Sequence, residues 1–302
     1  AGVLGDFTRT QTSGNWRSSN ALHANFNINH NNKEAEDTPT SSVIIGTQFE
    51  NYLIYNKMPY YYRLRHLSEF GTSKENGDPF RKNLDNIDLK NTFIYFLSNY
   101  LGIYSRFDIN SHFFQGFYNR DKAFNYIKNS VAGEIEEKEV DQNRMLTTPY
   151  IFPLKMKQGI GVNFRLFNQP RAHLNLRSGF GLRQDYMRGV YDLVESEYSP
   201  EGEDRKYRLY QENKNIYNTG TEFSRVGNFN LPFNLSYRTN ADLLIPFEEN
   251  SEVTFDWEND FNLRIFKYIS VYYRIDINSN PQDIQEFYFD QSIFLRLSYF
   301  FQ

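Results

Sequence analysis

Charged residues recur between apolar ones, at every second position, in several segments of this 302-residue chain. Residues 253–265 show the pattern clearly, because Val253, Phe255 and Trp257 alternate with polar and charged residues. In an extended strand this spacing places the charges on one face and the apolar side chains on the other. Arginines and carboxylates gathered on one face can form ion pairs or guide the passage of ions.

The charges predicted to share this polar face have both signs in nearly equal number. The basic members are Arg165, Arg177, Arg183, Arg238, Arg264, Arg274 and Arg296. The acidic members are Asp185, Glu222, Asp242, Asp256, Glu258, Asp260 and Asp276. Because buried charges must be paired and hydrogen-bonded, interleaved signs predict a network of ion pairs. The network could fill a closed interior, or it could line a narrow, selective channel.

A serine and a histidine offer a second kind of chemistry. Ser68 follows His66 by two residues, and His66 and His30 are both predicted on the apolar face. The sequence has no G-x-S-x-G motif, and the five histidines lack metal-ligand spacing. We therefore expect no catalytic residue, no metal site and no cofactor, and we interpret both histidines as interfacial residues.

Twelve segments with this alternation could position the charges. They are residues 20–31, 41–56, 59–71, 86–98, 101–118, 154–168, 171–187, 215–226, 230–246, 252–266, 268–279 and 287–301. Most are much longer than the roughly 5–6 residues usual in a soluble strand, and they suit tilted, membrane-crossing strands. Alternation alone does not say which face is inside, so a soluble sandwich with a buried apolar face remains the alternative.

The connections between these segments distinguish the two folds. Tight turns are predicted at 56–58, 99, 168–170, 227–229 and 266–267, and longer connections lie between them. Short periplasmic turns that alternate with long external loops are typical of outer-membrane barrels. We therefore predict an all-β fold: a single antiparallel up-and-down transmembrane β-barrel of about 12 strands, with long acidic extracellular loops, short periplasmic turns and both termini periplasmic.

The barrel is predicted to span residues 17–302 as one domain. Residues 1–16 lack alternation and are expected to form an N-terminal arm in the periplasm or the lumen. The longest connections, 119–153 and 188–214, are rich in Glu and Asp, and 119–145 is compatible with a short helix. These acids could be solvated, bind divalent cations or dock a partner, although their spacing fits no EF-hand loop.

Composition narrows the class of protein further. Aromatic residues make up 18% of the chain, led by 28 Phe and 23 Tyr, and such residues favour strands and membrane interfaces. The absence of Cys excludes disulfides and thiolate chemistry. A net charge of -4 gives no sign of nucleic-acid binding. The sequence has no apolar run long enough for a membrane helix, and it begins without a signal peptide, as expected of a mature form after cleavage.

The final strand resembles the closing strand of bacterial outer-membrane barrels. Large apolar residues occupy every second position from Ile293 to Phe301, and Gln302 follows. In that class the terminal aromatic belongs to the signal read by the barrel-assembly machinery. The resemblance implies that Leu297, Tyr299 and Phe301 form this signal.

Three segments carry a narrower resemblance, to an uncharacterised outer-membrane β-barrel family of Bacteroidota. They are Gly5–Trp16, Phe80–Asp85 and Asn218–Tyr299, the last containing the run Val253-Thr254-Phe255-Asp256-Trp257-Glu258-Asn259. The family is a domain of unknown function. It therefore implies a location in the cell outer membrane and a barrel fold, and it carries over no functional residues.

Two functions are expected for such a barrel. The first is that of a non-catalytic accessory or structural subunit of an outer-membrane complex for barrel assembly, secretion or uptake. The alternative is a small porin-like channel with a constricted, charged lumen. The expected partners are outer-membrane lipid including lipopolysaccharide, the barrel-assembly machinery, and other outer-membrane proteins or surface lipoproteins, with no nucleic acid among them.

Overall fold

The computed structural model describes residues 10–31, 40–75, 81–169, 171–200, 202–249, 251–279 and 287–301. These residues form seventeen β-strands: β1 Thr10–Ser13, β2 Trp16–Asn31, β3 Thr40–Lys57, β4 Tyr60–Glu75, β5 Arg81–Phe96, β6 Leu101–Ser111, β7 Gly116–Asn129, β8 Ile135–Thr148, β9 Leu154–Gln169, β10 Ala172–Tyr186, β11 Tyr191–Tyr198, β12 Tyr207–Glu212, β13 Ile216–Leu231, β14 Leu235–Pro246, β15 Thr254–Arg264, β16 Ile269–Ser279 and β17 Phe287–Phe301. In these ranges no helix is long and apolar enough to cross a membrane.

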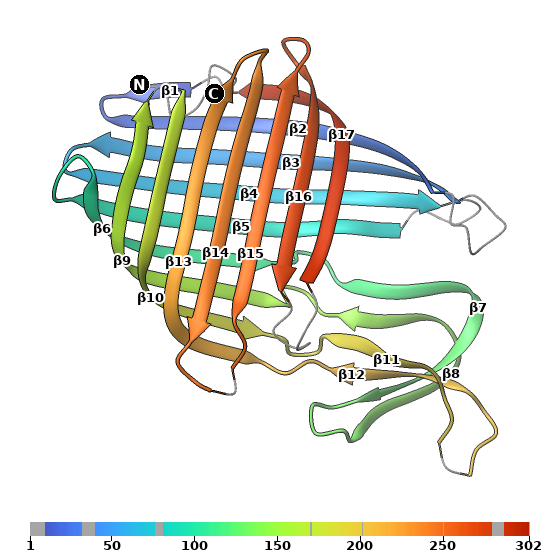
Figure 1. Ribbon diagram of the computed structural model, residues 1–302. Helices are drawn as coiled ribbons and strands as arrows, with labels where there is room; N and C mark the ends of the chain where they lie inside the picture. Colours follow the sequence, from blue (N-terminus) through green and yellow to red (C-terminus); the bar gives the residue numbers. More distant parts are fainter. Residues whose placement is uncertain are drawn as a thin grey trace. The chain divides into compact units, whose positions relative to one another are not determined.

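Two compact units make up the chain. The first contains Ala1–Asp108, Lys157–Arg183 and Asn218–Gln302, and the second contains Ile109–Met156 and Gln184–Tyr217. The long strands form a ring in the order β2-β17-β16-β15-β14-β13-β10-β9-β6-β5-β4-β3. Because β3 also pairs antiparallel with β2, the ring is closed, and Figure 1 shows its strands. The predicted barrel of about twelve antiparallel strands is therefore confirmed.

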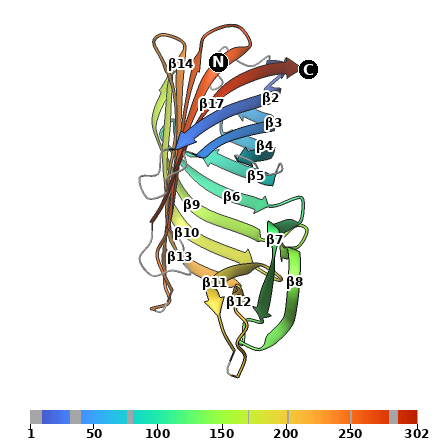
Figure 2. The same cartoon turned by 90° about the vertical axis from the view of Figure 1, so that its right-hand side faces the viewer.

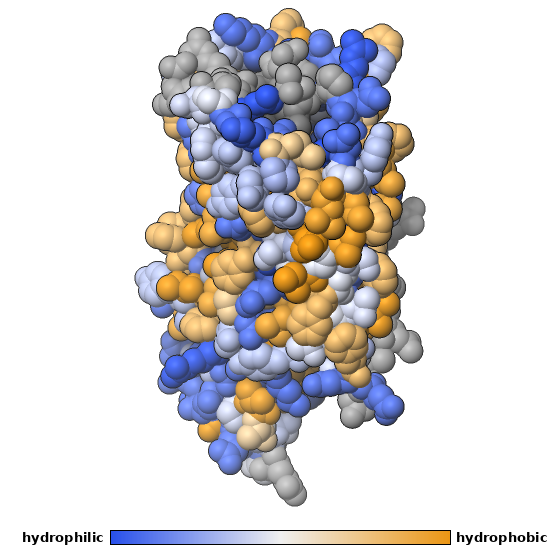
Figure 3. Space-filling model, turned by 90° about the vertical axis from the view of Figure 1, so that its left-hand side faces the viewer, coloured by the Kyte–Doolittle hydropathy of each residue, from blue (hydrophilic) through white to orange (hydrophobic). Residues whose placement is uncertain are grey.

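The wall of this barrel is polar inside and apolar outside. Along β6, Tyr104 and Arg106 are buried, whereas Ile103 before them and Phe107 after them are exposed. A soluble sandwich would show the reverse, because its apolar face would form the core. On the face drawn in Figure 3, hydrophobic residues gather in the middle and hydrophilic residues lie toward the upper end. The exposed apolar wall is that of a transmembrane barrel.

Aromatic side chains reinforce the outer wall across β13 to β16. Phe229 stacks on Tyr237 with ring centroids 5.7 Å apart, and Tyr237 stacks on Phe261 at 4.6 Å. Phe261 then stacks on Tyr273 at 6.1 Å. Cross-strand aromatic pairs of this kind stabilise neighbouring strands, and rows of Tyr and Trp mark membrane interfaces. Inside the barrel a smaller apolar cluster joins Ile54, Tyr61, Ile94, Phe96 and Tyr104.

One predicted turn is wrong. Residues 227–229 lie inside β13, and the chain turns instead at Pro232–Asn234, where Phe233 and Asn234 both have positive φ. Gly227 suggested a turn, but the reason for this glycine is packing. A Cβ atom there would come within 2.8 Å of the Phe229 ring and 3.0 Å of Thr239.

The N-terminal segment differs in part from the expected arm. Residues 1–9 of the predicted 1–16 arm lie outside the described residues. Thr10–Ser13 forms the short strand β1, which pairs antiparallel with the start of β2. Gly14 supports the hairpin turn with a φ of +60, a left-handed conformation that glycine adopts without strain.

The second unit replaces the predicted acidic loops with a four-stranded sheet. Its order is β11-β12-β7-β8, with β12 parallel to β7 and the other pairs antiparallel. The short helix predicted within 119–145 is wrong, because β7 and β8 occupy this segment. Phe124 and Tyr126, two residues apart, are both buried with Met145 and Tyr210, and this period of two is that of a strand.

Candidate functional site: the charged lumen

Strands from two sides of the barrel supply the charges of the lumen. Figures 1 and 2 show β3, β4 and β5 facing β14, β15 and β16 across the first unit. Because side chains alternate along each strand, every second residue points into the barrel. The inward residues of these six strands include carboxylates and cations at similar depths. Several of them meet directly across the lumen.

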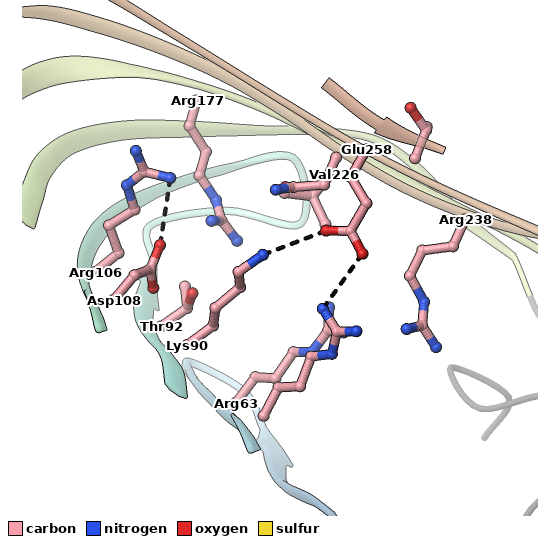
Figure 4. Close-up of a pocket in the computed structure, with 12 residues that line it drawn as sticks. Arg63, Lys90, Thr92, Arg106, Asp108, Arg177, Val226, Arg238 and Glu258 are labelled. Carbon is pink, nitrogen blue, oxygen red and sulfur yellow. Dashed lines mark hydrogen bonds and ion pairs between the residues drawn. The ribbon is translucent and has the colours of Figure 1, made fainter. Parts of the chain in front are cut away.

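Glu258 on β15 is the centre of the network. Its carboxylate lies 3.4 Å from Lys90 Nζ on β5 and 3.8 Å from Arg65 on β4. A third cation, Arg274 on the adjacent β16, lies 3.7 Å away. Lys90 has a second acidic partner, because Asp88 on the same strand lies 3.3 Å from its Nζ atom. Figure 4 shows Lys90 and Glu258 directed toward each other from facing walls of a small cavity.

A second group of ion pairs joins β3 and β4 to β14 and β16. Arg65 Nε and Arg238 Nη1 both donate to Glu50 Oε1 at 3.2 Å, and the Tyr52 hydroxyl donates to the same oxygen at 2.6 Å. Arg274 bridges the walls again, since it lies 3.0 Å from Asp260 and 3.4 Å from Glu69 on β4.

A third group is built around Arg106 on β6. Its guanidinium donates to Asp242 at 2.6 Å and to Glu222 at 2.9 Å, and Tyr104 OH donates to Glu222 at 2.9 Å. Gly159 makes room for this carboxylate, because a Cβ atom there would lie 2.6 Å from Glu222 Oε2. Glycine in the strand therefore permits the close approach of a buried, paired acid.

The structure brings most of the predicted charges together in these groups. Arg238, Arg274, Glu258 and Asp260 join the central pairs, Glu222 and Asp242 hold Arg106, and Arg183 and Asp256 meet with Lys157. Asp276 lies opposite Glu258 in the strand register, and Arg264 lies opposite Ser270 beside a turn. Asp185 is buried and belongs to the second unit. Arg165, Arg177 and Arg296 are buried in the lumen and, within the described residues, have no ion pair.

Sequence reasoning missed half of the network. The missed residues are Glu50, Arg65, Glu69, Asp88, Lys90, Arg106, Asp108 and Lys157. All of them lie in predicted strands, and those on β6 and β9 show the same alternation as the identified charges. Each faces inward, opposite the charges that were identified on β13 to β16.

The side chains of Ser68 and His66, which the sequence analysis considered together, are hydrogen-bonded to each other on the outer wall. Ser68 Oγ and His66 Nε2 are 2.9 Å apart, and Asn51 of β3 lies opposite His66 in the strand register. An acyl-transfer site also needs free backbone amides to bind an oxyanion. The register of β4 with both β3 and β5 is continuous past His66 and Ser68, so the amides here belong to the ladder. The side chain of His30 lies outside the described residues.

The three residues predicted as an assembly signal lie on the outer face of β17. Leu297 and Tyr299 are exposed, and Phe301 stacks on Phe49 of β3 with ring centroids 6.0 Å apart. This strand closes the barrel, because Phe301 pairs with Asn20 of β2 in the strand register.

Two small cavities remain between the ion pairs. One of about 130 Å³ lies among residues of β2 to β4 and β13 to β17, and its lining includes Glu50, Arg238 and Arg296. The other, of about 50 Å³, includes Arg63, Lys90, Arg177 and Glu258, and Figure 4 shows it. Among the described residues no group of three His, Asp or Glu could hold a metal ion.

The fold and the charged lumen define a transmembrane β-barrel whose interior is crossed by ion pairs. A family model described as a protein of unknown function (DUF3078) matches residues 35–117, which include β3 to β6. This match agrees with the expectation of an uncharacterised family. No curated protein matches the chain.

Solved structures that resemble the chain are bacterial barrels. The β domain of the Bordetella autotransporter BrkA is 7% identical, with a TM-score of 0.35 and coverage of 95% of this chain and 99% of that one. The translocator domain of NalP from Neisseria meningitidis is 7% identical, with a TM-score of 0.38 and coverage of 96% and 89%. An outer membrane channel from Pseudomonas putida F1 is 9% identical, with a TM-score of 0.38 and 99% of both chains covered. The fold assignment itself rests on the strand pairing described above.

Proposed function

We propose that this protein is a non-catalytic barrel of the bacterial outer membrane that does not conduct solutes and serves as a subunit of an outer-membrane protein complex. The observation that carries the proposal is the 3.4 Å pair between Lys90 and Glu258, which joins opposite walls of the barrel. Ion pairs that cross a lumen narrow the aqueous path that a porin needs, and this supports a barrel that does not conduct. The outer membrane is the setting in which single-chain barrels with an even strand number occur.

The second unit is the part that we assign to partner binding. Strand β11 is exposed along most of its length, and Leu193 and Val194 are 42% and 63% exposed. It lies at the edge of its sheet, next to β12 alone in the strand order. An exposed edge strand with adjacent apolar side chains can pair with or pack against another protein. Asp192, Glu195 and Glu197 would favour a partner with a basic surface.

A native pull-down from the cell's own outer membrane in mild detergent tests this function. We expect stoichiometric partners by mass spectrometry with the tagged wild-type protein. The double variant Leu193→Ser/Val194→Ser should lose them and keep its heat-modifiable mobility as a folded barrel. Phe233→Ser is the matched control, since it removes an exposed apolar residue from a turn of the first unit. Migration of the wild type as a lone monomer would contradict the proposal.

A small porin-like channel is the second candidate. The two polar cavities favour it, because a modest rearrangement of arginine side chains could join them. Single-channel recording in planar bilayers separates the two functions. Discrete conductance steps with the wild-type protein would support the channel, whereas a silent barrel supports the subunit.

A further inference from the structure

Three arginines on β4, β9 and β10 form a cationic group inside the barrel. Arg63, Arg165 and Arg177 each face the lumen, and within the described residues none of them makes an ion pair. This arrangement contrasts with Arg65, Lys90, Arg106 and Arg238, each of which lies within 4.0 Å of at least one carboxylate. Buried guanidinium groups without a direct ion pair are costly, so an anionic ligand would stabilise this group.

These arginines contact aromatic rings and one side-chain amide. Arg165 lies 3.7 Å above the ring of Phe96, and Arg63 lies 5.2 Å from the ring centroid of Tyr52. Arg177 donates from Nε to Asn163 Oδ1 at 3.4 Å. Rings hold a guanidinium in place but neutralise little of its charge. The charges therefore stay available to an anion.

His173 on β10 is buried four residues before Arg177, and both side chains face the lumen because they alternate in the strand. Its imidazole hydrogen-bonds to the Asn175 side chain at 2.8 Å. The cluster of Arg63, Arg165, Arg177 and His173, with the amides of Asn163 and Asn175, is called the arginine cluster below.

Four buried polar atoms of the arginine cluster have no hydrogen-bond partner within the described residues. They are Asn163 Nδ2, Arg165 Nε, His173 Nδ1 and Asn175 Oδ1. Three of the four are nitrogens that can donate a hydrogen bond. Buried donors without partners are rare in folded proteins, and they also occur on Arg65, Arg106 and Arg274, but here the three donors lie on residues without an ion pair and can serve an acceptor. The orphaned atoms are an observation independent of the missing ion pairs.

The arginine cluster lies between two cavities. Arg63 and Arg177 line the lumen cavity of about 50 Å³, and Figure 4 shows their side chains directed into it together with Lys90. Arg165 lines a second cavity of about 480 Å³ at the short turns, together with Met58, Asn99 and Tyr100. The first volume exceeds the 10–15 Å³ or so that one water needs, so a small ion fits there. The second lies at the end of the barrel with the short turns.

We propose that the arginine cluster is a binding site for a small oxyanion, of the phosphate or carboxylate type, which enters the barrel from the end with the short turns. The planar guanidinium groups of Arg63 and Arg177, which line the smaller cavity, donate paired hydrogen bonds to its oxygens. Asp108 and Glu258 also line this cavity, but both pair with other cations, Arg106 and Lys90 among them, so the bound anion supplies the direct partner that Arg63 and Arg177 lack within the described residues. The site is independent of partner binding by the second unit.

Thermal unfolding of the full-length barrel in detergent tests the site, with inorganic phosphate and acetate as probes at constant ionic strength against chloride. We expect a saturable rise in the unfolding midpoint with at least one oxyanion, because a ligand that binds only the folded state stabilises it. Phosphate alone, acetate alone or both would identify the class. Absence of any rise, or an equal rise with chloride, would overturn the proposal.

Arg63→Gln and Arg177→Gln assign the binding to the cluster. Each should raise the oxyanion dissociation constant about tenfold or more, since each removes charge-assisted hydrogen bonds. In oxyanion-free buffer both variants should be at least as stable as the wild type, a result that a purely structural role would not give. Arg183→Gln on β10 is the matched control, because Arg183 lies 3.8 Å from Asp256 and should leave the oxyanion response unchanged. Unchanged binding in both cluster variants would also overturn the assignment.

Discussion

Lys90 and Glu258 lie on β5 and β15, six strands apart in either direction around the ring of twelve, and their charged atoms are 3.4 Å apart. Two extended side chains therefore span the barrel at this level. A ring of this strand number has an interior only somewhat wider than the eight-stranded barrels whose side chains fill it. The charges act as the core of the molecule, and ion pairing replaces the apolar packing of a soluble protein.

A double-mutant cycle measures what this pair contributes. Lys90→Met and Glu258→Gln should each destabilise the barrel, and the coupling between them should be about 1–2 kcal/mol, between the values for exposed and desolvated pairs. Both side chains are partly exposed, at 30% and 22%, which keeps the coupling modest. Guanidinium-induced unfolding followed by the fluorescence of Trp16 and Trp257 gives the free energies. Strictly additive effects would show that the two groups do not interact.

Removal of the bridging side chains should open the lumen. The triple variant Arg65→Ser/Lys90→Ser/Glu258→Ser deletes the long side chains that join the walls, so we expect discrete conductance steps in planar bilayers where the wild type gives none. Lys206→Ser, whose partner Glu197 is exposed in the second unit, is the control and should stay silent. A silent triple variant would mean that other side chains close the barrel.

Gly159 offers a test of the Arg106 group that changes no charge. Gly159→Ala places a methyl group 2.6 Å from Glu222 Oε2, and Arg106 and Tyr104 hold this carboxylate in position. We expect a loss of about 1–3 kcal/mol in unfolding free energy, the usual cost of overpacking. Gly46→Ala should cost less, because its Cβ would meet nothing closer than 3.3 Å. Equal effects of the two variants would show that Glu222 can move aside freely.

The barrel could be predicted from sequence because its outer wall is apolar and its turns are short. Most outward positions of residues 253–265 and 269–277 are apolar, so their inward charges were identified. The strands β3 to β5 carry polar residues on both faces, among them Asn51, His66 and Asn91, whose amide and imidazole groups bond on the outer wall. This outer polarity hides the period of two, and the charges between these residues were missed.

Contacts across the lumen depend on information that no single strand contains. Which residue of β5 meets which residue of β15 follows from the tilt and stagger of the whole ring. The second unit was missed for another reason. Its edge strand β11 is exposed along most of its length, so Asp192 to Glu197 show no apolar face, and acidic residues in a long connection suggested a loop.

The second unit should lose stability in acid. Burial works against the ionised form of Glu137, but hydrogen bonds from Lys128 and Tyr126 outweigh it and lower the pKa of this carboxyl below its usual range. A lowered pKa in the folded state stabilises the fold above the unfolded value of about 4.3, and this contribution is lost as the pH falls toward the folded value. Hydrogen exchange of β7 and β8 between pH 7 and 3 measures the loss. Glu137→Gln should flatten this pH dependence, and an unchanged profile in the variant would assign it to other carboxyls.

Closure of the barrel at β17 provides the last prediction. Phe301 stacks on Phe49 of β3 across the intervening β2, and Tyr299 stacks on Phe301 with ring centroids 6.2 Å apart. We expect Tyr299→Ala/Phe301→Ala to lower the fraction of folded barrel in cells several-fold, measured by heat-modifiable gel mobility. Ile293→Ala is the matched control, since it lies on the same exposed face of β17, away from this stack. Refolding of purified protein into detergent then separates two causes. If the double variant refolds as well as the wild type, the aromatic pair is needed for assembly in the cell. If it refolds poorly, the pair acts through the stability of the closed ring, and the proposed role as an assembly signal would be wrong.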